Sequence, residues 1–230
     1  MYDVTVVGGG IIGLSVAKQI SEHHPGKKIV LLEKEQSIGL HQTGHNSGVV
    51  HSGIYYKPGS QKALFCTAGV KLLKDYCLKT GIDYFECGKV IVATEVSELE
   101  ALYTLYSRGK ENGVPGMEII EPERLKEIEP NARGIKALHL PNTAVVDYPL
   151  VTQSYARDFE VLEGLILTDT RVTKISSYSD ELVIETNQDA IKTKYLINSA
   201  GLYADVISKM MKTLRDVHIF PFRGDYYVLR

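Results

Sequence analysis

The first 33 residues contain the feature that most constrains the fold of this chain. A short run rich in β-branched side chains, residues 4–7, leads into a G-x-G-x-x-G motif at Gly8, Gly10 and Gly13. A helical pattern of apolar residues follows, and then a second apolar run that ends at Glu33. The first glycine permits a tight turn, the second lets the backbone approach a pyrophosphate, and the third lets the helix pack closely on the strand. This order predicts the first half of a dinucleotide-binding βαβ fold.

Glu33 and the start of the helix would contribute to such a site in different ways. The helix N-terminus offers free N–H groups and a positive dipole end to phosphates. Glu33 ends the second strand about 20 residues after the motif, where a carboxylate accepts hydrogen bonds from ribose hydroxyls and would repel the ribose phosphate of NADP. The alternative is a bare structural turn, because a glycine motif alone is weak evidence. The complete order of strand, motif, helix, strand and acid favours dinucleotide binding.

Composition argues against several classes of function. The net charge of −2 argues against non-specific binding to nucleic acid, which needs a surplus of Lys and Arg. Cys66, Cys77 and Cys87 are odd in number and match no zinc spacing, so we expect buried thiols in a reducing compartment. His41 and His45 have a metal-like spacing but fall in a glycine-containing loop, so we predict no metal there. No apolar run approaches the ~20 residues that span a bilayer and no signal peptide precedes the first strand, which predicts a soluble protein or one resting on a membrane surface.

Further along, βα units alternate with runs of strands. We expect a helix capped by Ser60 and ending near Thr80, with an apolar stripe made by Phe65, Ala68, Leu72 and Tyr76. A second helix would start at a capping box of Ser97 and Glu100 and end near Asn112. The other expected elements are strands over 83–94, a small helix after Pro122, a strand-like segment over 138–146, a helix over 149–162, three or four strands over 165–194, a strand-turn-helix over 193–211 and a strand-like ending over 218–230. This alternation predicts an α/β nucleotide domain interrupted by a sheet-rich second domain.

Two stretches rich in small residues each have a bland and a specific interpretation. Residues 45–60, HNSGVVHSGIYYKPGS, combine glycines and serines with two histidines, an asparagine and paired tyrosines. They form either a surface loop or a wall of a cofactor and substrate site. Residues 197–205, INSAGLYAD, form either a simple strand-to-helix turn or a turn whose small residues let the backbone lie against a ligand.

These motifs together resemble FAD-dependent oxidoreductases of the D-amino-acid oxidase type. The narrower segments GHNSGVVHSGIYYKPGSQKA, VDY at 146–148 and PFRGDYYVL near the end resemble the L-2-hydroxyglutarate dehydrogenase (oxidase) family. The resemblance runs from Tyr2 to Arg230, and that family continues beyond this point. It implies an α/β fold, with a Rossmann-like FAD-binding domain of the glutathione-reductase type and an inserted sheet-rich substrate domain, C-terminally incomplete. The FAD domain would comprise 1–80 and 148–213, and the substrate domain 81–147 and 214–230.

The resemblance also implies FAD as the cofactor and assigns residues to it. The segment from His45 to Gly48 would run along the pyrophosphate and the flavin ring and offer N–H and hydroxyl donors, and residues 51–56 would border the isoalloxazine. Val172 would meet the adenine through its backbone. The implied cofactor-binding residues are Gly8, Gly10, Ile11, Ile12, Gly13, Glu33, Lys34, Thr43, His45, Asn46, Ser47, Gly48, Val172, Ala200 and Gly201.

The implied reaction is oxidation of L-2-hydroxyglutarate to 2-oxoglutarate, with hydride transfer from C2 to the flavin and removal of the hydroxyl proton. Histidine as a residue type suits the removal of that proton, which makes His51 the candidate base, although a histidine in a Gly/Ser loop is more often a structural hydrogen-bonder. Arg223 would bind a substrate carboxylate with two bonds, and the alternative is a surface ion pair with Asp225. Lys57 is a weaker second cation, and the hydroxyl of Tyr55 would either donate to the substrate or merely pack.

Other interpretations stay open at this point. The chain could be an amine or amino-acid oxidase of the same fold, a nicotinamide-dependent dehydrogenase, or an inactive fragment of a flavoprotein. As partners we expect a small 2-hydroxy dicarboxylate and a quinone-type acceptor or oxygen, in the cytoplasm or on the matrix side of the mitochondrion, including peripheral contact with the inner membrane. Because the strand-like ending has no closing turn, we expect the 230-residue chain to bind FAD poorly and to turn over little or nothing.

Overall fold

The computed structural model describes residues 1–213 and 216–225. Contacts divide the chain into two compact units, each described here by itself. The first unit contains Met1–Asn46 and the described residues from Tyr148 onward, and the second contains Ser47–Asp147. These units are defined by packing alone, so the assignment of the predicted domains to FAD and to substrate stays a prediction.

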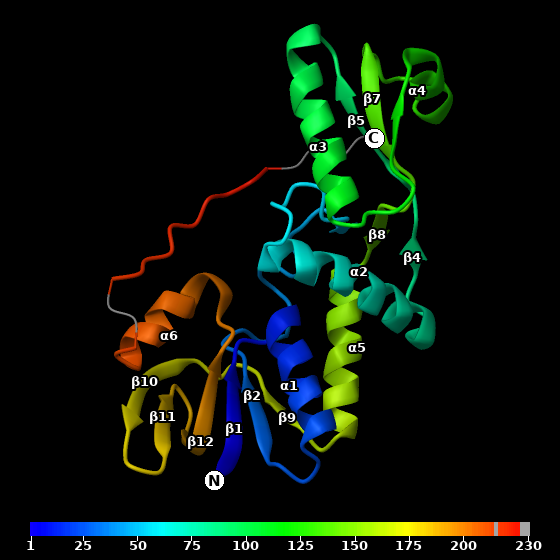
Figure 1. Ribbon diagram of the computed structural model, residues 1–230. Helices are drawn as coiled ribbons and strands as arrows, with labels where there is room; N and C mark the ends of the chain where they lie inside the picture. The colour runs from blue at the N-terminus through cyan, green and yellow to red at the C-terminus, as the bar shows by residue number, and fades with distance from the viewer. Residues whose placement is uncertain (214–215, 226–230) are drawn as a thin grey trace. The chain divides into compact units, whose positions relative to one another are not determined.

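The first unit is built on a six-stranded sheet of order β10-β11-β12-β1-β2-β9 (Figure 1). β1 is parallel to both of its neighbours, and β9 is parallel to β2, whereas β10, β11 and β12 pair antiparallel. The strands are β1 (Tyr2–Val7), β2 (Ile29–Leu32), β9 (Leu165–Leu167), β10 (Val172–Ser177), β11 (Leu182–Thr186) and β12 (Ala190–Asn198). The first two strands of the βαβ unit and the strand before the S-A-G turn therefore share one sheet, as expected.

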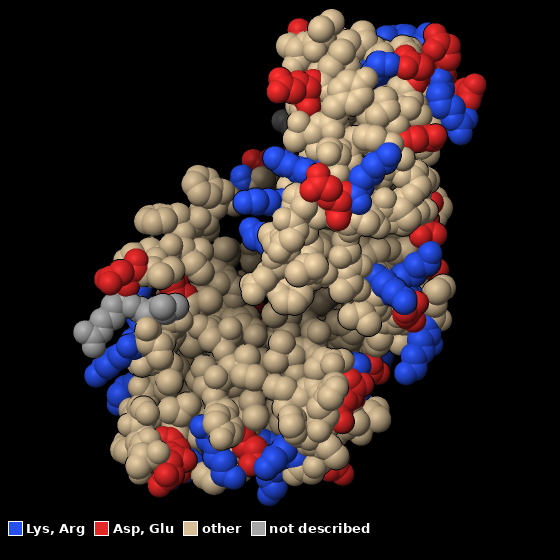
Figure 2. Space-filling model, in the orientation of Figure 1, with Lys and Arg blue, Asp and Glu red and all other residues tan. Residues whose placement is uncertain are grey.

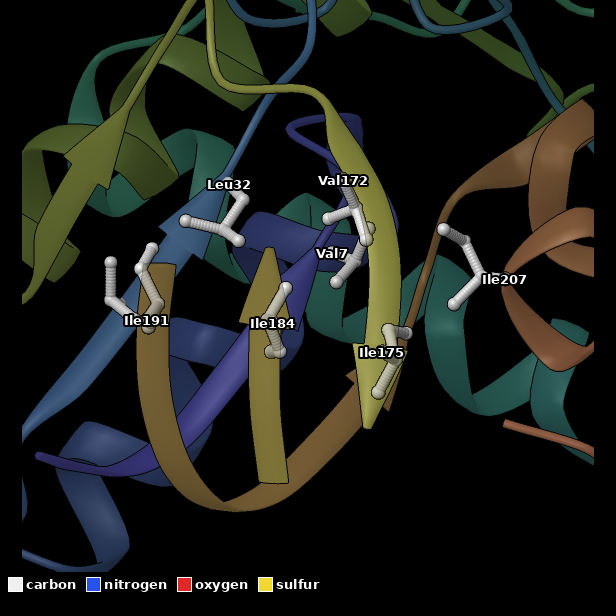
Figure 3. Close-up of a cluster of buried hydrophobic side chains, with 8 residues drawn as sticks. Val7, Leu32, Val172, Ile175, Ile184, Ile191 and Ile207 are labelled. Atoms are coloured by element: carbon white, nitrogen blue, oxygen red, sulfur yellow. The ribbon is translucent and has the colours of Figure 1, made fainter. Parts of the chain in front are cut away.

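Alternation along β1 and β2 sends side chains into two cores. Val6, Ile29 and Leu31 pack with Leu14 and Phe159, which lie on helices α1 (Ile11–His23) and α5 (Tyr148–Val161). Their neighbours Val7, Val30 and Leu32 face the other core, where strands β10 to β12 contribute Val172, Ile175, Ile184 and Ile191 (Figure 3). Ile207, on the short helix α6 (Ala204–Met210), closes that core after the 3-10 turn η2 (Gly201–Tyr203). Because β1 and β2 are buried on both faces, they are nearly continuous apolar runs.

The second unit contains two small antiparallel sheets and three helices. One sheet has the order β3-β8-β4 and the other β5-β7-β6. The strands are β3 (Val49–Val50), β4 (Tyr84–Phe85), β5 (Lys89–Ala93), β6 (Glu118–Ile120), β7 (Lys136–Leu140) and β8 (Ala144–Val146). The helices are α2 (Gln61–Thr80), α3 (Leu99–Glu111), which follows the 3-10 turn η1 (Val96–Glu98), and α4 (Pro122–Ile128).

Strand β5 also separates two cores by alternation. Ile91 and Ala93 pack with Leu102 of α3 and with Ile54, which comes from the loop before α2. Val90 and Val92 face the other way, toward the core that contains Leu125 of α4. Lys89 therefore lies at the start of the strand on the same side as Ile91 and Ala93.

The ends of α2 follow the expected capping, but its buried face does not follow the expected stripe. The Ser60 hydroxyl accepts from the Ala63 N–H, and Gly81 ends the helix with φ of 70°. Phe65 and Leu72 are 72% and 68% exposed, whereas the buried residues of the helix are Ala63 and Cys77. The predicted stripe is wrong because small side chains fill the narrow space beneath the helix.

Three smaller expectations also need correction. Helix α3 is preceded by Glu98, whose carboxylate accepts from the backbone N–H of Thr94 at 2.6 Å, so the Ser97–Glu100 capping box is not formed. Cys77 is buried, but Cys66 is only half-buried and Cys87 is exposed. The described part of the strand-like ending, 216–225, contains no strand, and residues 226–230 lie outside the described residues.

The surface shows no charge segregation on the face drawn in Figure 2, where basic and acidic side chains lie next to one another. This fits the small net charge. Among residues 1–213 and 216–225, no helix has the length and apolarity that crossing a membrane requires.

Candidate functional site

Two glycines of the motif are required by the fold of the first unit itself. Gly8 has φ of 112°, a conformation that side chains rarely adopt, and a Cβ on it would collide with the carbonyl of Ser199. A Cβ on Gly13 would collide with the carbonyl oxygen of Gly8, because α1 packs directly against the turn that follows β1. Packing and backbone conformation alone therefore explain why the first and third positions of the motif are glycines.

Gly10 differs from its two partners in the motif. Its φ of −77° suits any residue, and the nearest atom to a Cβ placed there is the Thr43 hydroxyl at 3.2 Å. The fold therefore does not demand a glycine at this position. A close approach by a ligand's phosphates to the start of α1 does demand one.

Glu33 lies beside this turn, at the carboxyl end of β2. Its Oε2 accepts from the Gly9 N–H at 2.7 Å, and its Oε1 accepts from the Glu35 N–H at 2.9 Å. Thr43 closes the same region, because its hydroxyl accepts from the Ile11 N–H at 3.1 Å. In open α/β sheets, ligands bind beyond the carboxyl ends of the strands, and the predicted ribose acceptor lies there.

The late S-A-G turn reaches the glycine motif from β12. The Ser199 N–H donates to the Val7 carbonyl at 2.9 Å, which places the turn beside Gly8. Gly201 has φ of 55°, so this position favours glycine. Val172 is 8% exposed and its side chain lies in the core, and its contact with the adenine stays a prediction. The fold thus brings three separated predicted segments to one edge of the sheet.

Lys34, predicted as a cofactor residue, belongs to a cluster that the sequence pattern did not indicate. Its ammonium lies 2.6 Å from Glu35 Oε1 and 4.4 Å from the centre of the Tyr203 ring. His41 Nε2 lies 2.9 Å from the same carboxylate oxygen. The hydrogen bond from Lys34, and then that from His41, holds the pKa of Glu35 below its usual value.

We therefore expect Glu35 to titrate below the usual range for a glutamate, and Lys34→Met to raise its pKa. A lowered native pKa means that the contribution of this pair to stability is present above the unfolded-state pKa and is lost as the pH falls through the native pKa. NMR titration of the carboxyl carbon measures the pKa of Glu35 in the parent chain and in Lys34→Met. Lys74→Met, which removes the lysine paired with Glu86 in the other unit, is the control and should leave the pKa of Glu35 unchanged. If Glu35 has an ordinary pKa in the unsubstituted chain, the hydrogen bonds that Lys34 and His41 make to it are contradicted.

The predicted segment from His45 to Gly48 is divided between the two units. In the first unit, His45 Nδ1 lies 3.0 Å from the His41 carbonyl, and the Asn46 amide donates to the Thr43 carbonyl at 2.7 Å. Ser47 and Gly48 belong to the second unit, where Gly48 has φ of 71° and its carbonyl accepts from the Val146 N–H at 2.9 Å. Their roles at a cofactor stay predictions.

The loop from His51 to Tyr56 is held in place within the second unit. Ile54 is 1% exposed and fills the core beside β5. The side-chain amide of Asn112, at the end of α3, donates to the carbonyls of Gly53 and Tyr56, both at 3.0 Å. The Cys66 thiol donates to the His51 carbonyl at 2.9 Å. Buried and hydrogen-bonded groups therefore fix the backbone conformation of this loop.

Asn112 and Cys66 are residues that the sequence reasoning missed as supports of this loop. A polar amide at a helix end before Gly113 is a weak signal, because such residues usually only terminate helices. Cys66 gave no signal beyond its number. Both partners are far along the chain from the loop, so only the folded structure joins them.

The predicted cations differ in their surroundings. Arg223 Nε lies 2.7 Å from Asp225 Oδ1, and the two side chains are 88% and 71% exposed, which is the surface ion pair weighed as the alternative. Lys57 is exposed and lies in the same loop as His51 and Tyr55. The structure therefore places three of the four predicted catalytic residues on one loop and Arg223 in the other unit. Their catalytic roles stay predictions.

Comparisons with known proteins agree with this geometry. A family model described as FAD dependent oxidoreductase matches residues 3–230. Mitochondrial L-2-hydroxyglutarate dehydrogenase of Homo sapiens is 43% identical over 241 residues, a match that covers all of this chain and 52% of the relative. L-2-hydroxyglutarate dehydrogenase of Escherichia coli O17:K52:H18 is 42% identical over 230 residues, covering all of this chain and 54% of the relative.

Solved structures give the same fold. Dithionite-reduced L-alpha-glycerophosphate oxidase from Mycoplasma pneumoniae, with FAD bound, matches with a TM-score of 0.85 and 28% identity, over 91% of this chain and 56% of that one. Glycine oxidase from Geobacillus kaustophilus matches with a TM-score of 0.81 and 21% identity, over 92% of this chain and 58% of that one, which shows the fold alone. The chain spans about half the length of the relatives that it matches.

Proposed function

Because this chain belongs to the family of FAD dependent oxidoreductases, we propose that it supplies the FAD-binding part of an enzyme that oxidises L-2-hydroxyglutarate to 2-oxoglutarate. The family and the fold expected from the motifs are confirmed by the comparisons. The observation that carries the proposal is Gly10, where only the Thr43 hydroxyl lies near an added Cβ and where we infer that an approaching pyrophosphate requires the glycine. Relatives at 42% and 43% identity over the whole chain support the hydroxy-acid substrate.

The residues around the glycine turn fit FAD. N–H groups in the first turn of α1 beyond that of Ile11, which donates to Thr43, would bind the pyrophosphate, and Glu33, held by Gly9 and Glu35, would accept from the adenosine ribose. The Ser199–Gly201 turn would place backbone, without bulky side chains, next to Gly8. The lysine next to Glu33, Lys34, is paired with Glu35 and so would not favour a ribose phosphate at Glu33.

When bound, the flavin supplies a two-electron acceptor for the hydride that leaves C2 of the substrate. The residues of the chain would carry out the rest. His51, on the fixed loop, would take the proton from the C2 hydroxyl, since a neutral imidazole is a suitable base near neutral pH. Loss of one hydride and one proton converts the secondary alcohol to a ketone, which is 2-oxoglutarate. A quinone-type acceptor or oxygen would then receive the electrons, and peripheral membrane contact belongs to the same proposal.

A reconstitution experiment tests the proposal. We would compare the 230-residue chain with a chimera that appends the remaining half of the Escherichia coli relative after Arg230, both supplied with FAD. In the chimera, L-2-hydroxyglutarate is expected to bleach the flavin absorbance anaerobically and to yield one 2-oxoglutarate per flavin. D-2-hydroxyglutarate is the matched control, since only the configuration at C2 differs.

Two results would count against the proposal. Release of ammonia from an amino acid, with no bleaching by the hydroxy acid, would assign the chain to an amine or amino-acid oxidase instead. A chimera that lacks flavin colour and instead reduces or oxidises a nicotinamide cofactor would assign this chain to nicotinamide-dependent enzymes. The 230-residue chain alone is expected to bind FAD weakly and to show little turnover.

A further inference from the structure

The second unit contains a half-buried lysine with no carboxylate partner. Of the lysines in Ser47–Asp147, three are half-buried: Lys74, Lys89 and Lys136. Lys74 binds Glu86 at 2.8 Å and Lys136 binds Glu121. Lys89 is paired with no acidic residue among residues 1–213 and 216–225. Its hydrogen bond to Tyr55 is exposed, so the ammonium is open to a charged ligand that could serve as its counter-ion.

The partner that Lys89 does have is Tyr55. Its ammonium donates to the Tyr55 hydroxyl at 2.7 Å and lies 4.7 Å from the centre of the same ring. Tyr55 lies on the loop that Ile54 and Asn112 fix, so the phenol has a defined position. Strand β5 fixes Lys89 in turn, because its register with β7 pairs Lys89 with Leu140.

This pair has the chemistry of a carboxylate site. The Tyr55 oxygen accepts from Lys89, which leaves its own proton available as a donor. The ammonium has further N–H groups to donate, and charge-assisted hydrogen bonds to a carboxylate are stronger than neutral ones. One ammonium and one hydroxyl therefore match the two oxygens of a carboxylate, on the same loop as the proposed base His51.

We propose that Lys89, with Tyr55, binds a carboxylate group of the substrate, a role for which the sequence had suggested Arg223 and Lys57. The inference rests on the proposed function. Arg223 already has a carboxylate partner in Asp225, whereas Lys89 has none among residues 1–213 and 216–225. The substrate carboxylate would supply a counter-ion for the Lys89 ammonium.

Lysine NMR tests the binding step in the FAD-loaded chimera. Lysines carrying ¹³C-methyl groups keep their charge, and the Lys89 signal is assigned by its loss in Lys89→Met. Titration with glutarate is expected to shift the Lys89 signal saturably, with Lys110 as the control because its ammonium also lies over a tyrosine ring, 4.6 Å from the centre of Tyr106. A Lys89 signal that does not move, or that moves only as much as that of Lys110, overturns the proposal.

Kinetics in the chimera give a second, independent test. Lys89→Met is expected to lower kcat/KM for L-2-hydroxyglutarate by about 10- to 100-fold, and Lys89→Arg to restore part of it. Lys110→Met, the same charge change beside a tyrosine, is expected to have no effect. FAD content and melting temperature of Lys89→Met must equal those of the parent, so that lost packing does not imitate lost binding.

A monocarboxylic substrate, L-2-hydroxybutanoate, then identifies the carboxylate. A loss confined to the dicarboxylate assigns Lys89 to the distal carboxylate, and a loss on both substrates assigns it to the carboxylate next to C2. Equal rates for Lys89→Met and Lys110→Met on both substrates overturn the inference. That outcome differs from failure of the proposed function, in which the parent chimera itself does not use L-2-hydroxyglutarate.

Discussion

Gly13→Ala is expected to destabilise the first unit strongly, by at least about 3 kcal/mol, or to prevent its folding. The new Cβ would collide with the carbonyl oxygen of Gly8, which is backbone in the tight turn and cannot rotate away as a side chain would. Either α1 moves off the sheet or the turn distorts, and both changes open the core around Leu14 and Phe159. Urea unfolding monitored by circular dichroism measures the loss.

The matched control for this prediction is Gly69→Ala on helix α2. A Cβ at Gly69 meets no atom within 4 Å, so the same substitution should stabilise the helix by roughly 0.5–1 kcal/mol through its higher helix propensity. The same chemical change is thus expected to have opposite signs at two helical glycines. Equal unfolding midpoints for the two variants would refute the close packing of α1 on the turn.

Gly10→Val is expected to weaken FAD binding by at least about 100-fold, close to 3 kcal/mol, while the fold persists. The backbone at Gly10 accepts any residue, and only the Thr43 hydroxyl lies near the added Cβ, at 3.2 Å. The valine side chain would instead occupy the space through which a pyrophosphate approaches the start of α1. Quenching of flavin fluorescence on titration into the FAD-free chimera measures the affinity.

Gly10→Ala separates the two parts of this claim. Its smaller side chain should leave the melting temperature near that of the parent, because the neighbouring hydroxyl needs to shift by only a few tenths of an ångström. FAD binding should still fall, although less than with valine. If both variants bind FAD as the parent does, the glycine at position 10 has no ligand role and the main support for the proposed function is lost.

Much of the first unit could be predicted from local sequence. The order of strand, glycine motif, helix, strand and acid is contiguous, so short-range geometry alone places Gly8 directly after β1, Gly13 in the first turn of α1 and Glu33 at the carboxyl end of β2. Helix α2 was likewise predicted at both ends, because its Ser60 cap and Gly81 stop act through neighbouring backbone groups. The buried face of α2 was not predicted, because it depends on what packs beneath the helix and not on the helix itself.

The loop proposed to border the substrate, within residues 45–60, shows the same limit of prediction from sequence. The composition of residues 45–60 indicated a site, yet the groups that shape the loop are Asn112, Cys66 and Lys89, which lie far from it in sequence or on other elements. Sequence patterns assign residue types to roles, and on that basis Arg223 was the natural choice for a carboxylate. Pairing in the fold gives Arg223 a carboxylate partner in Asp225, and in the described part of the chain it leaves Lys89 without one.

The sequence by itself determined the nucleotide-binding unit, the family and the residues that could do the chemistry, because these depend on short-range backbone geometry and on the identity of side chains. Only the tertiary structure decided why Gly8 and Gly13 must be glycines, which apolar faces are buried and which half-buried lysine of the second unit pairs with a tyrosine. Those properties depend on distances between segments that are remote in the chain, and such distances are set when the strands pair and the cores close around them.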